Sequence, residues 1–207
     1  MVKESFVIEK ANITGIILCG GRGARLSGLD KPLIDLGSKR IVDCMIERLS
    51  DQVCDLILSC SRNVALYEAL GYRVVVDGEP SEGPLAGLHE SFSRVETEWV
   101  LTTPGDVPFI PRSLVDRLTE DALSRGVSVP SIQGQQQNLC MILGTQERES
   151  LSEFYIKGGR AVKEWLQQHS IPATDLSDMA LDFLNVNTMY ELNEARSRFA
   201  LENKSAV

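Results

Sequence analysis

The feature that most constrains this chain is a glycine-rich loop that directly follows a short apolar run, ITGIILC at residues 13–19. Glycine lets the backbone approach a ligand closely, and successive N–H groups form a cradle for anions, while neighbouring cations add charge for several phosphates. The residues concerned are Gly20, Gly21, Arg22, Gly23, Arg25 and Lys31. This stretch therefore predicts a loop that binds a nucleoside triphosphate.

The spacing of the loop excludes two common phosphate-binding motifs. A Walker loop needs Lys-Ser or Lys-Thr after its second glycine, whereas Gly28 is followed by Leu29 and Asp30. A dinucleotide-binding GxGxxG needs a third glycine where Leu26 stands. The loop thus disfavours both a P-loop NTPase and an NAD-dependent oxidoreductase.

Short β-branched runs alternate with longer amphipathic stretches along the chain, a pattern typical of βα units around a mainly parallel sheet. We expect strands at Ile13–Cys19, Asp55–Ser59, Arg73–Val76, Trp99–Thr103 and Val127–Pro130. Apolar residues at helical spacing between these runs predict helices that cover the sheet. For a chain of 207 residues, this predicts one domain with a three-layer, Rossmann-like α/β fold and helices on both faces of the sheet.

The order is less regular from Gly134 onward, where we expect a second substrate to bind. A polar turn is expected at 133–137, a strand at 139–143, and a helix at 151–169 that Gly158 and Gly159 interrupt. The stretch 181–203 is expected to form a strand, a polar turn and a final helix. We therefore divide the domain into a nucleotide-binding part at about 13–130 and an acceptor-binding part at about 131–200.

Charge and cysteine content narrow the functional class. A formal net charge of -8 argues against a general nucleic-acid binder, because such proteins neutralise phosphates with Lys and Arg. The five cysteines include no CxxC pair, so neither a disulfide framework nor a zinc site is indicated. No run approaches the ~20 apolar residues that span a bilayer, and no apolar signal core is present, so we expect a cytoplasmic protein.

Two aspartates follow predicted strands, and ligands of open α/β sheets bind at the carboxyl ends of strands. Asp106 lies just beyond WVLTT, and Asp77 ends RVVV. Magnesium prefers one or two carboxylates plus phosphate oxygens, so Asp106 is a candidate for holding a metal that the triphosphate carries. Asn185 and Asn187 share one face of an extended segment, where their amide oxygens can complete the metal shell or bind a substrate phosphate. The alternative role for these residues is to cap the final helix, and for Thr188 we prefer this capping role.

Four motifs in order resemble a known family. The stretch LCGGRGARLSGLDKPLIDLGSKRIVD is similar to the nucleotidyltransferase signature. GPLAGL, TPGDVPFIP and NVNTMYEL, which follow it along the chain, resemble segments of the molybdenum cofactor guanylyltransferases. The resemblance runs from about Ile13 to Leu192 and implies a fold of the nucleoside-diphospho-sugar transferase type.

The resemblance also implies an activity and a set of site residues. The chain would transfer GMP from GTP to the phosphate of molybdenum-molybdopterin with Mg²⁺ as cofactor, releasing pyrophosphate. Asp106 would bind the metal and act in catalysis with Lys31 and Arg25, and Asn185 and Asn187 would bind the acceptor. The implied nucleotide-binding residues are Leu18, Cys19, Gly20, Gly21, Arg22, Gly23, Lys31, Ser61, Asp77 and Asp106. Molybdoenzymes or other cofactor-biosynthesis proteins are the implied partners, with no nucleic acid and no membrane.

The chain departs from the family pattern at three places. Ser61 stands where an asparagine is usual, and residues 137–139 read Gln-Asn-Leu instead of His-Pro-Thr. Residues 25–28 read Arg-Leu-Ser-Gly, where Arg-Met-Gly-Gly is common. A related transferase that uses CTP or a sugar phosphate, and a non-catalytic nucleotide-binding adaptor, therefore remain alternatives.

We interpret His89, inside the helix expected after GPLAG, as structural rather than as a base.

Overall fold

The computed structural model describes residues 7–20, 28–77 and 83–205 of the chain. Its centre is a single sheet of eight strands in the order β3-β2-β1-β4-β7-β5-β6, with β8 paired to β5. The strands are β1 (Ile13–Leu18), β2 (Asp55–Cys60), β3 (Arg73–Val76), β4 (Trp99–Pro104), β5 (Val127–Ile132), β6 (Gln135–Gln136), β7 (Met141–Gly144) and β8 (Ala173–Asp175). The five strands expected from apolar runs are thus confirmed to within two residues at their ends.

The sheet is parallel through β3, β2, β1 and β4. β7 runs antiparallel to both of its neighbours, β4 and β5, and β8 returns parallel to β5. The reversal at β7 arises because the chain makes a tight turn and a short hairpin after β5 in place of a crossover helix, with Gln133 and Gly134 both at positive φ. The mainly parallel sheet is confirmed, and the polar turn expected at 133–137 occupies only its first residues, since β6 follows.

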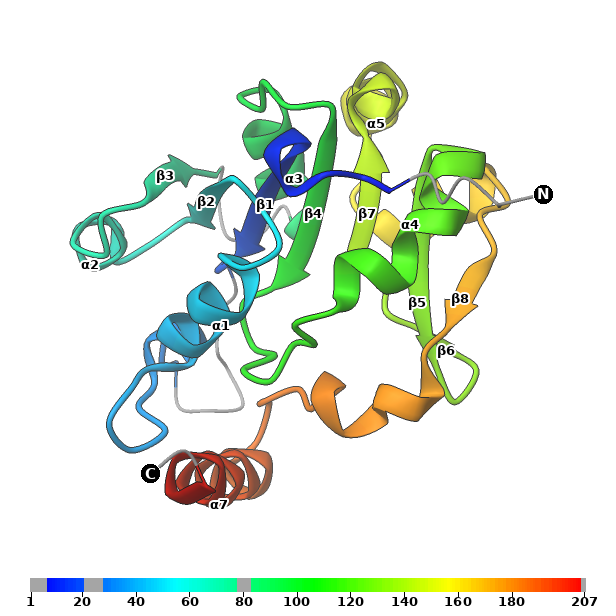
Figure 1. Ribbon diagram of the computed structural model, residues 1–207. Helices are drawn as coiled ribbons and strands as arrows, with labels where there is room; N and C mark the ends of the chain where they lie inside the picture. Colours follow the sequence, from blue (N-terminus) through cyan, green and yellow to red (C-terminus); the bar gives the residue numbers. More distant parts are fainter. Residues whose placement is uncertain (1–6, 21–27, 78–82, 206–207) are drawn as a thin grey trace.

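Seven α-helices pack around this sheet in the described part of the chain (Figure 1). They are α1 (Ile41–Leu49), α2 (Val64–Glu68), α3 (Pro84–Phe92), α4 (Leu114–Arg125), α5 (Arg148–Ile156), α6 (Val162–Gln168) and α7 (Met189–Ser205). Short 3₁₀ segments lie at Lys10–Asn12, Lys31–Leu33, Thr145–Glu147 and Ser177–Phe183. The helix expected at 151–169 is divided into α5 and α6 around the two glycines, as predicted.

Alternating strand residues feed two hydrophobic clusters, one on each face of the sheet. Ile17 and Leu58 lie in the cluster with the apolar faces of α1, α4 and α7, whereas Ile16 and Ile57 lie in the cluster with α3, α5 and α6. The molecule therefore has the three layers that the sequence predicts. Each layer of helices fixes the sheet from one side and leaves the carboxyl edge of the strands free for loops.

One predicted element is wrong. The strand expected in the first part of 181–203 is absent: a 3₁₀ segment ends at Phe183, and the chain then crosses the sheet edge until α7 begins at Met189. This crossing segment gives one backbone hydrogen bond to the loop after β4, from the N–H of Val186 to the carbonyl of Asp106 (2.9 Å). It forms no ladder because it does not run alongside a strand.

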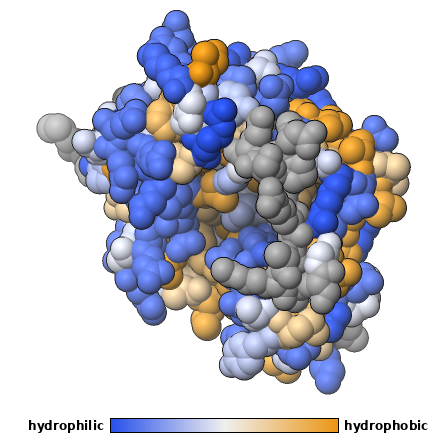
Figure 2. Space-filling view, turned by 180° about the vertical axis from the view of Figure 1, so that it is seen from behind, coloured by the Kyte–Doolittle hydropathy of each residue, from blue (hydrophilic) through white to orange (hydrophobic). Residues whose placement is uncertain are grey.

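The surface opposite to the view of Figure 1 is mostly hydrophilic, with hydrophobic residues in small scattered groups (Figure 2). Among the described helices, none combines the length and apolar character that crossing a membrane requires.

Candidate nucleotide-binding site

The carboxyl ends of the parallel strands place most of the sequence-predicted residues at one edge of the sheet. Backbone hydrogen bonds tie the loops there together: the Gly105 N–H donates to Leu18 O (2.9 Å), and the Cys19 N–H donates to Ser59 O (2.7 Å). The Asp77 N–H donates to Cys60 O (3.1 Å). The loops after β1, β2, β3 and β4 are therefore held in a fixed order along the edge where α/β proteins bind ligands.

Lys31 joins two loops that are far apart in sequence. Its Nζ lies 3.1 Å from Oδ2 of Asp106 and donates a hydrogen bond of 2.5 Å to Oδ1 of Asn187. The side chains of Lys31 and Asp106 are each 21% exposed, so the ion pair is partly shielded and still open to a ligand. One ammonium thus brings together a carboxylate after β4 and an amide oxygen before α7.

Asn187 is held in place by the start of α7. The carboxylate of Glu191 accepts hydrogen bonds from the N–H groups of Asn187 (2.7 Å) and Thr188 (2.8 Å). In return, the Glu191 N–H donates to Oγ1 of Thr188 (3.3 Å), which completes a capping box. The capping role expected for Thr188 is confirmed, whereas Asn185 turns back to donate to Phe183 O (3.4 Å).

Asp77 lies against the first described glycine of the loop. A Cβ added to Gly20 would come within 3.1 Å of Oδ2 of Asp77, and one added to Gly87 of α3 would come within 2.6 Å of the same oxygen. Ser59 donates a hydrogen bond to this oxygen (3.2 Å). Burial raises the pKa of Asp77 above the ordinary carboxyl value, and the Ser59 hydrogen bond opposes this rise. The Asp77 carboxyl group is therefore closely packed at the glycine loop.

A third aspartate, Asp30, lies at the end of the loop and was not singled out from the sequence. Its side chain is 6% exposed and accepts hydrogen bonds from Tyr67 Oη (2.9 Å) and Asn63 Nδ2 (2.8 Å). Arg62 donates to the carbonyl oxygens of Gly28 (2.9 Å) and Leu29 (3.0 Å). Burial raises the pKa of Tyr67, so its hydroxyl stays a hydrogen-bond donor. These contacts fix the backbone immediately before Lys31.

The remaining predicted nucleotide-binding and catalytic residues divide into three groups. Leu18 and Cys19 are buried, and burial raises the pKa of the Cys19 thiol, so these residues can offer a ligand only their main-chain groups. Ser61 is partly exposed directly after β2. The other predicted residues, Gly21, Arg22, Gly23 and Arg25, lie outside the described residues.

The Gln-Asn-Leu segment at 137–139 also reaches this edge of the sheet. Thr102 Oγ1 of β4 donates to the Leu139 carbonyl (2.9 Å), and the Gln137 N–H donates to Pro130 O (2.8 Å). The segment therefore bridges β4 and β5 in the carboxyl-terminal half of each strand. It lies on the side of β4 that faces β7, away from β1 and the glycine loop that follows β1.

His89 packs against α5, an arrangement that fits the structural role expected for it. Its ring stacks on Tyr155 with 4.6 Å between centroids, and its Nε2 lies 3.1 Å from Ser152 Oγ.

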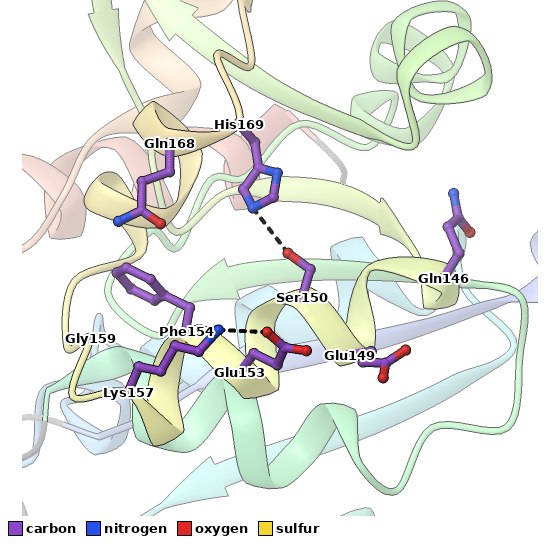
Figure 3. Close-up of a pocket in the computed structure, with 9 residues that line it drawn as sticks. All are labelled: Gln146, Glu149, Ser150, Glu153, Phe154, Lys157, Gly159, Gln168 and His169. Atoms are coloured by element: carbon purple, nitrogen blue, oxygen red, sulfur yellow. Dashed lines mark hydrogen bonds and ion pairs between the residues drawn. The ribbon is translucent and has the colours of Figure 1, made fainter.

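A pocket of about 600 Å³ lies over the outer side of α5 and α6 and contains none of the predicted site residues. Ser150 and His169 point toward one another across it, with 3.0 Å between Oγ and Nε2, and Lys157 pairs with Glu153 (Figure 3).

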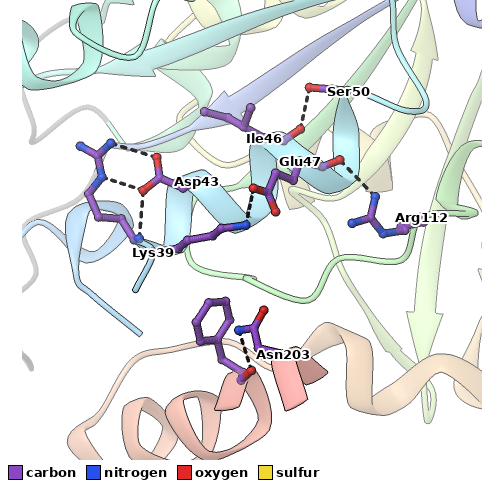
Figure 4. A network of polar contacts seen from close by, with 9 residues as sticks. Lys39, Asp43, Ile46, Glu47, Ser50, Arg112 and Asn203 are labelled. Carbon is purple, nitrogen blue, oxygen red and sulfur yellow. Dashed lines mark hydrogen bonds and ion pairs between the residues drawn. The ribbon is translucent and has the colours of Figure 1, made fainter. Parts of the chain in front are cut away.

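A smaller pocket of about 190 Å³ lies between α1 and the C-terminal part of α7. There Lys39 pairs with Glu47 (2.5 Å), Arg112 donates to the Glu47 carbonyl (3.2 Å), and Asn203 donates to Phe199 O (2.9 Å; Figure 4). The guanidinium of Arg198 lies over the ring of Phe109, 4.1 Å from its centroid. This contact between Arg198 and Phe109 anchors the helix whose first turn positions Asn187.

Comparison with known proteins gives a consistent family signal. Residues 15–173 match the family described as MobA-like NTP transferase domain. The chain is 34% identical over 200 residues to the molybdenum cofactor guanylyltransferase of Cupriavidus taiwanensis, covering 93% of this chain and 100% of that protein. It is 36% identical over 195 residues to the protein of the same name from Cupriavidus metallidurans, covering 90% of this chain and 96% of that protein.

Solved structures support the fold. The molybdopterin-guanine dinucleotide biosynthesis protein A of Archaeoglobus fulgidus superposes with a TM-score of 0.73 at 16% identity, covering 91% of this chain and 98% of that chain. The 2-C-methyl-D-erythritol 4-phosphate cytidylyltransferase of Thermus thermophilus superposes with a TM-score of 0.70 at 16% identity, covering 90% and 98%. Both chains share the α/β nucleotidyltransferase architecture described above.

Proposed function

Because the chain belongs to the family of MobA-like NTP transferases, we propose that it is a molybdenum cofactor guanylyltransferase. It transfers GMP from GTP to the phosphate of molybdenum-molybdopterin, and it forms a guanine dinucleotide cofactor and pyrophosphate. The observation that carries this proposal is the identity of 34–36% to proteins of that name over at least 90% of the chain. The meeting of Lys31, Asp106 and Asn187 at the sheet edge supplies a matching site.

The reaction needs charge stabilisation more than it needs a proton carrier. An oxygen of the acceptor phosphate attacks the α-phosphorus of GTP, and the bond from that phosphorus to the oxygen bridging to the β-phosphate breaks. The acceptor oxygen is already anionic, so no strong general base is required. Lys31 and Arg25 neutralise the triphosphate, and backbone N–H groups at Gly20 and Gly21 hold it in line with the acceptor.

Magnesium is the expected cofactor, and the site fits it. A carboxylate oxygen of Asp106 and the amide oxygen of Asn187 both contact the ammonium of Lys31. The two oxygens therefore already surround a position that holds a cation. No group of three or more His, Cys, Asp or Glu suited to a metal occurs within the part of the chain that the structure describes. Magnesium is commonly held by one or two carboxylates and by the phosphates of its nucleotide, and when bound it offsets the charge of the leaving pyrophosphate.

We assign the two substrates to the two parts of the domain. Residues of about 13–130 bind GTP, with Asp77 and Ser61 directed at the base or ribose and Asp106 at the metal. Residues of about 131–200 bind the pterin acceptor, for which Asn185, Asn187 and the Gln-Asn-Leu segment at 137–139 are the candidates. We expect the enzyme to act in the cytoplasm and to deliver its product to molybdoenzymes or other cofactor-biosynthesis proteins.

Substrate competition tests the proposal. The protein is incubated with Mg²⁺, molybdenum-molybdopterin and either GTP or CTP, and pyrophosphate release is followed. We expect release with GTP and at least about tenfold less with CTP. Preference for CTP, which Ser61 in place of asparagine leaves open, would assign the enzyme to cytidylyl transfer. Nucleotide binding without pyrophosphate release from any acceptor would instead indicate an adaptor.

A further inference from the structure

Lys31 occupies an unusual position for a residue that is expected to bind phosphate. Its ammonium contacts oxygens of Asp106 and Asn187, and these are also the oxygens that converge where a metal would be held. Lys31 and a divalent cation therefore compete for the same oxygen atoms.

On the basis of the proposed function, we propose that Lys31 is an internal cation that fills the metal position until the nucleotide arrives. The divalent cation enters between Asp106 and Asn187 only when a triphosphate draws the ammonium away. Metal and nucleotide then bind as one unit, and the protein without nucleotide excludes the free metal.

The charges at this position support the exchange. Asp106 and Asn187 together carry one formal negative charge, which the ammonium of Lys31 balances at 3.1 Å from the carboxylate. A dication placed beside this ammonium would meet like-charge repulsion in a partly shielded site, where charges interact more strongly than in bulk water. A triphosphate brings several negative charges, and it offers both Lys31 and the metal new partners.

The backbone around the three residues is fixed, so the lysine side chain is the part that can move. The N–H groups of Leu33 and Ile34 donate to Asp30 O and Lys31 O at 3.0 Å each, which sets the backbone of Lys31. Asp106 is tied through its carbonyl to the Val186 N–H (2.9 Å).

Asn187 is held on the other side by Glu191 through its own N–H (2.7 Å). A lysine has a flexible four-carbon stem, whereas the two oxygen ligands are short side chains on anchored backbone. The oxygen pair therefore stays assembled when Lys31 leaves.

Thermodynamic linkage makes the proposal measurable. If the ammonium blocks the metal and the triphosphate removes this block, nucleotide must increase metal affinity, and metal must increase nucleotide affinity by the same factor. Removing the ammonium should raise the affinity for metal alone and reduce this coupling.

The test is Mn²⁺ binding to the full-length protein without nucleotide, measured by calorimetry and by electron paramagnetic resonance. We expect Lys31→Met to bind Mn²⁺ about tenfold more tightly than wild type, since one like charge is removed from a partly exposed site. Lys39→Met, which removes a lysine that pairs with Glu47 in α1, should bind Mn²⁺ like wild type. Adding Asp106→Asn to Lys31→Met should abolish the gain.

Mn²⁺ affinity that is unchanged or lower in Lys31→Met overturns the proposal. Circular dichroism checks that Lys31→Met is folded. If it is unfolded, the comparison is repeated with Lys31→Gln, which has a shorter polar side chain. Pyrophosphate release by the wild type is measured in parallel. If wild type forms the dinucleotide but neither variant gains Mn²⁺ affinity, the cation exchange is wrong and guanylyl transfer stands.

Discussion

Lys31 and Asp106 are 75 residues apart in sequence, and their charged groups lie 3.1 Å apart at the carboxyl edge of the sheet. The contact joins the end of the glycine-rich loop to the loop after β4. We propose that this pair, with Asn187, is where the triphosphate and its metal meet the protein.

Asp106→Ala should retain the fold and lose more than about a hundredfold in kcat, because charge on the leaving pyrophosphate would no longer be offset by a metal at this position. Steady-state pyrophosphate release measures the effect, with thermal unfolding as the check on the fold. Asp116→Ala, at an exposed position of α4, is the matched control and should be fully active. Activity of Asp106→Ala near that of the control would remove Asp106 from the metal site.

Lys31→Ala should weaken GTP binding in the presence of Mg²⁺ by about ten- to a hundredfold, since one cation facing the phosphates is lost. Fluorescence titration with a labelled GTP analogue gives the affinity. Lys163→Ala, on the exposed face of α6, serves as the control. Equal affinity in the two variants would mean that Lys31 does not reach the triphosphate.

Glu191→Ala should lower both stability and activity, because the carboxylate caps α7 and holds the backbone of Asn187. Loss of a helix cap costs about 1 kcal/mol of unfolding free energy. Glu191→Gln keeps an acceptor oxygen and should restore most of the kcat, and Glu194→Ala, exposed on the same helix, should have little effect. A purely structural role would lower stability in Glu191→Ala and leave kcat of the folded protein unchanged.

Gly87→Ala should weaken GTP binding through Asp77. The new Cβ would lie 2.5 Å from Ser59 Oγ and 2.6 Å from Asp77 Oδ2, so both side chains must move. Ser59→Ala makes space for the methyl group, and the double variant should regain part of the lost affinity, which a double-mutant cycle measures. Additive losses in the double variant would contradict this steric coupling.

Stability should depend on pH through Asp77. Because burial raises the pKa of Asp77 in the folded protein, the folded state holds this proton more tightly than the unfolded state. Its contribution to stability is therefore present at acidic pH and is lost as pH rises from the ordinary carboxyl value of 3.8 through the raised pKa.

Asp77→Asn should thus unfold at higher denaturant concentration than wild type at neutral pH, with the difference disappearing in acid. Urea unfolding at several pH values measures this. A constant difference across pH would show that the Asp77 carboxyl does not titrate in this window.

The fold was largely predictable because its strands are short apolar runs whose burial on both faces is visible in the sequence. Lys31 and Asp106 could be expected to share an edge, since both follow parallel strands. The first part of 181–203 could not be predicted correctly, because its apolar residues Leu184 and Val186 resemble a strand, and only its path across the sheet edge prevents pairing.

Other parts of the site depend on packing that no local pattern encodes. Tyr67 contacts Asp30 because α2 packs beside the loop. No pattern in the sequence around Tyr67 predicts this contact. The alternation of side chains along an extended segment predicts the same role for Asn185 and Asn187. In the structure only Asn187 contacts Lys31, because the Glu191 carboxylate of the capping box holds its backbone N–H.

The central claim, guanylyl transfer, is tested most directly by following the α-phosphate of GTP. The protein is incubated with Mg²⁺, molybdenum-molybdopterin and GTP labelled at the α-phosphate, and the products are separated and identified by mass spectrometry. We predict that the label appears in a guanine dinucleotide of the pterin cofactor, in amounts equal to the pyrophosphate released, and that Asp106→Ala forms none. Label that stays in GTP, or that appears only in free GMP, would contradict the account.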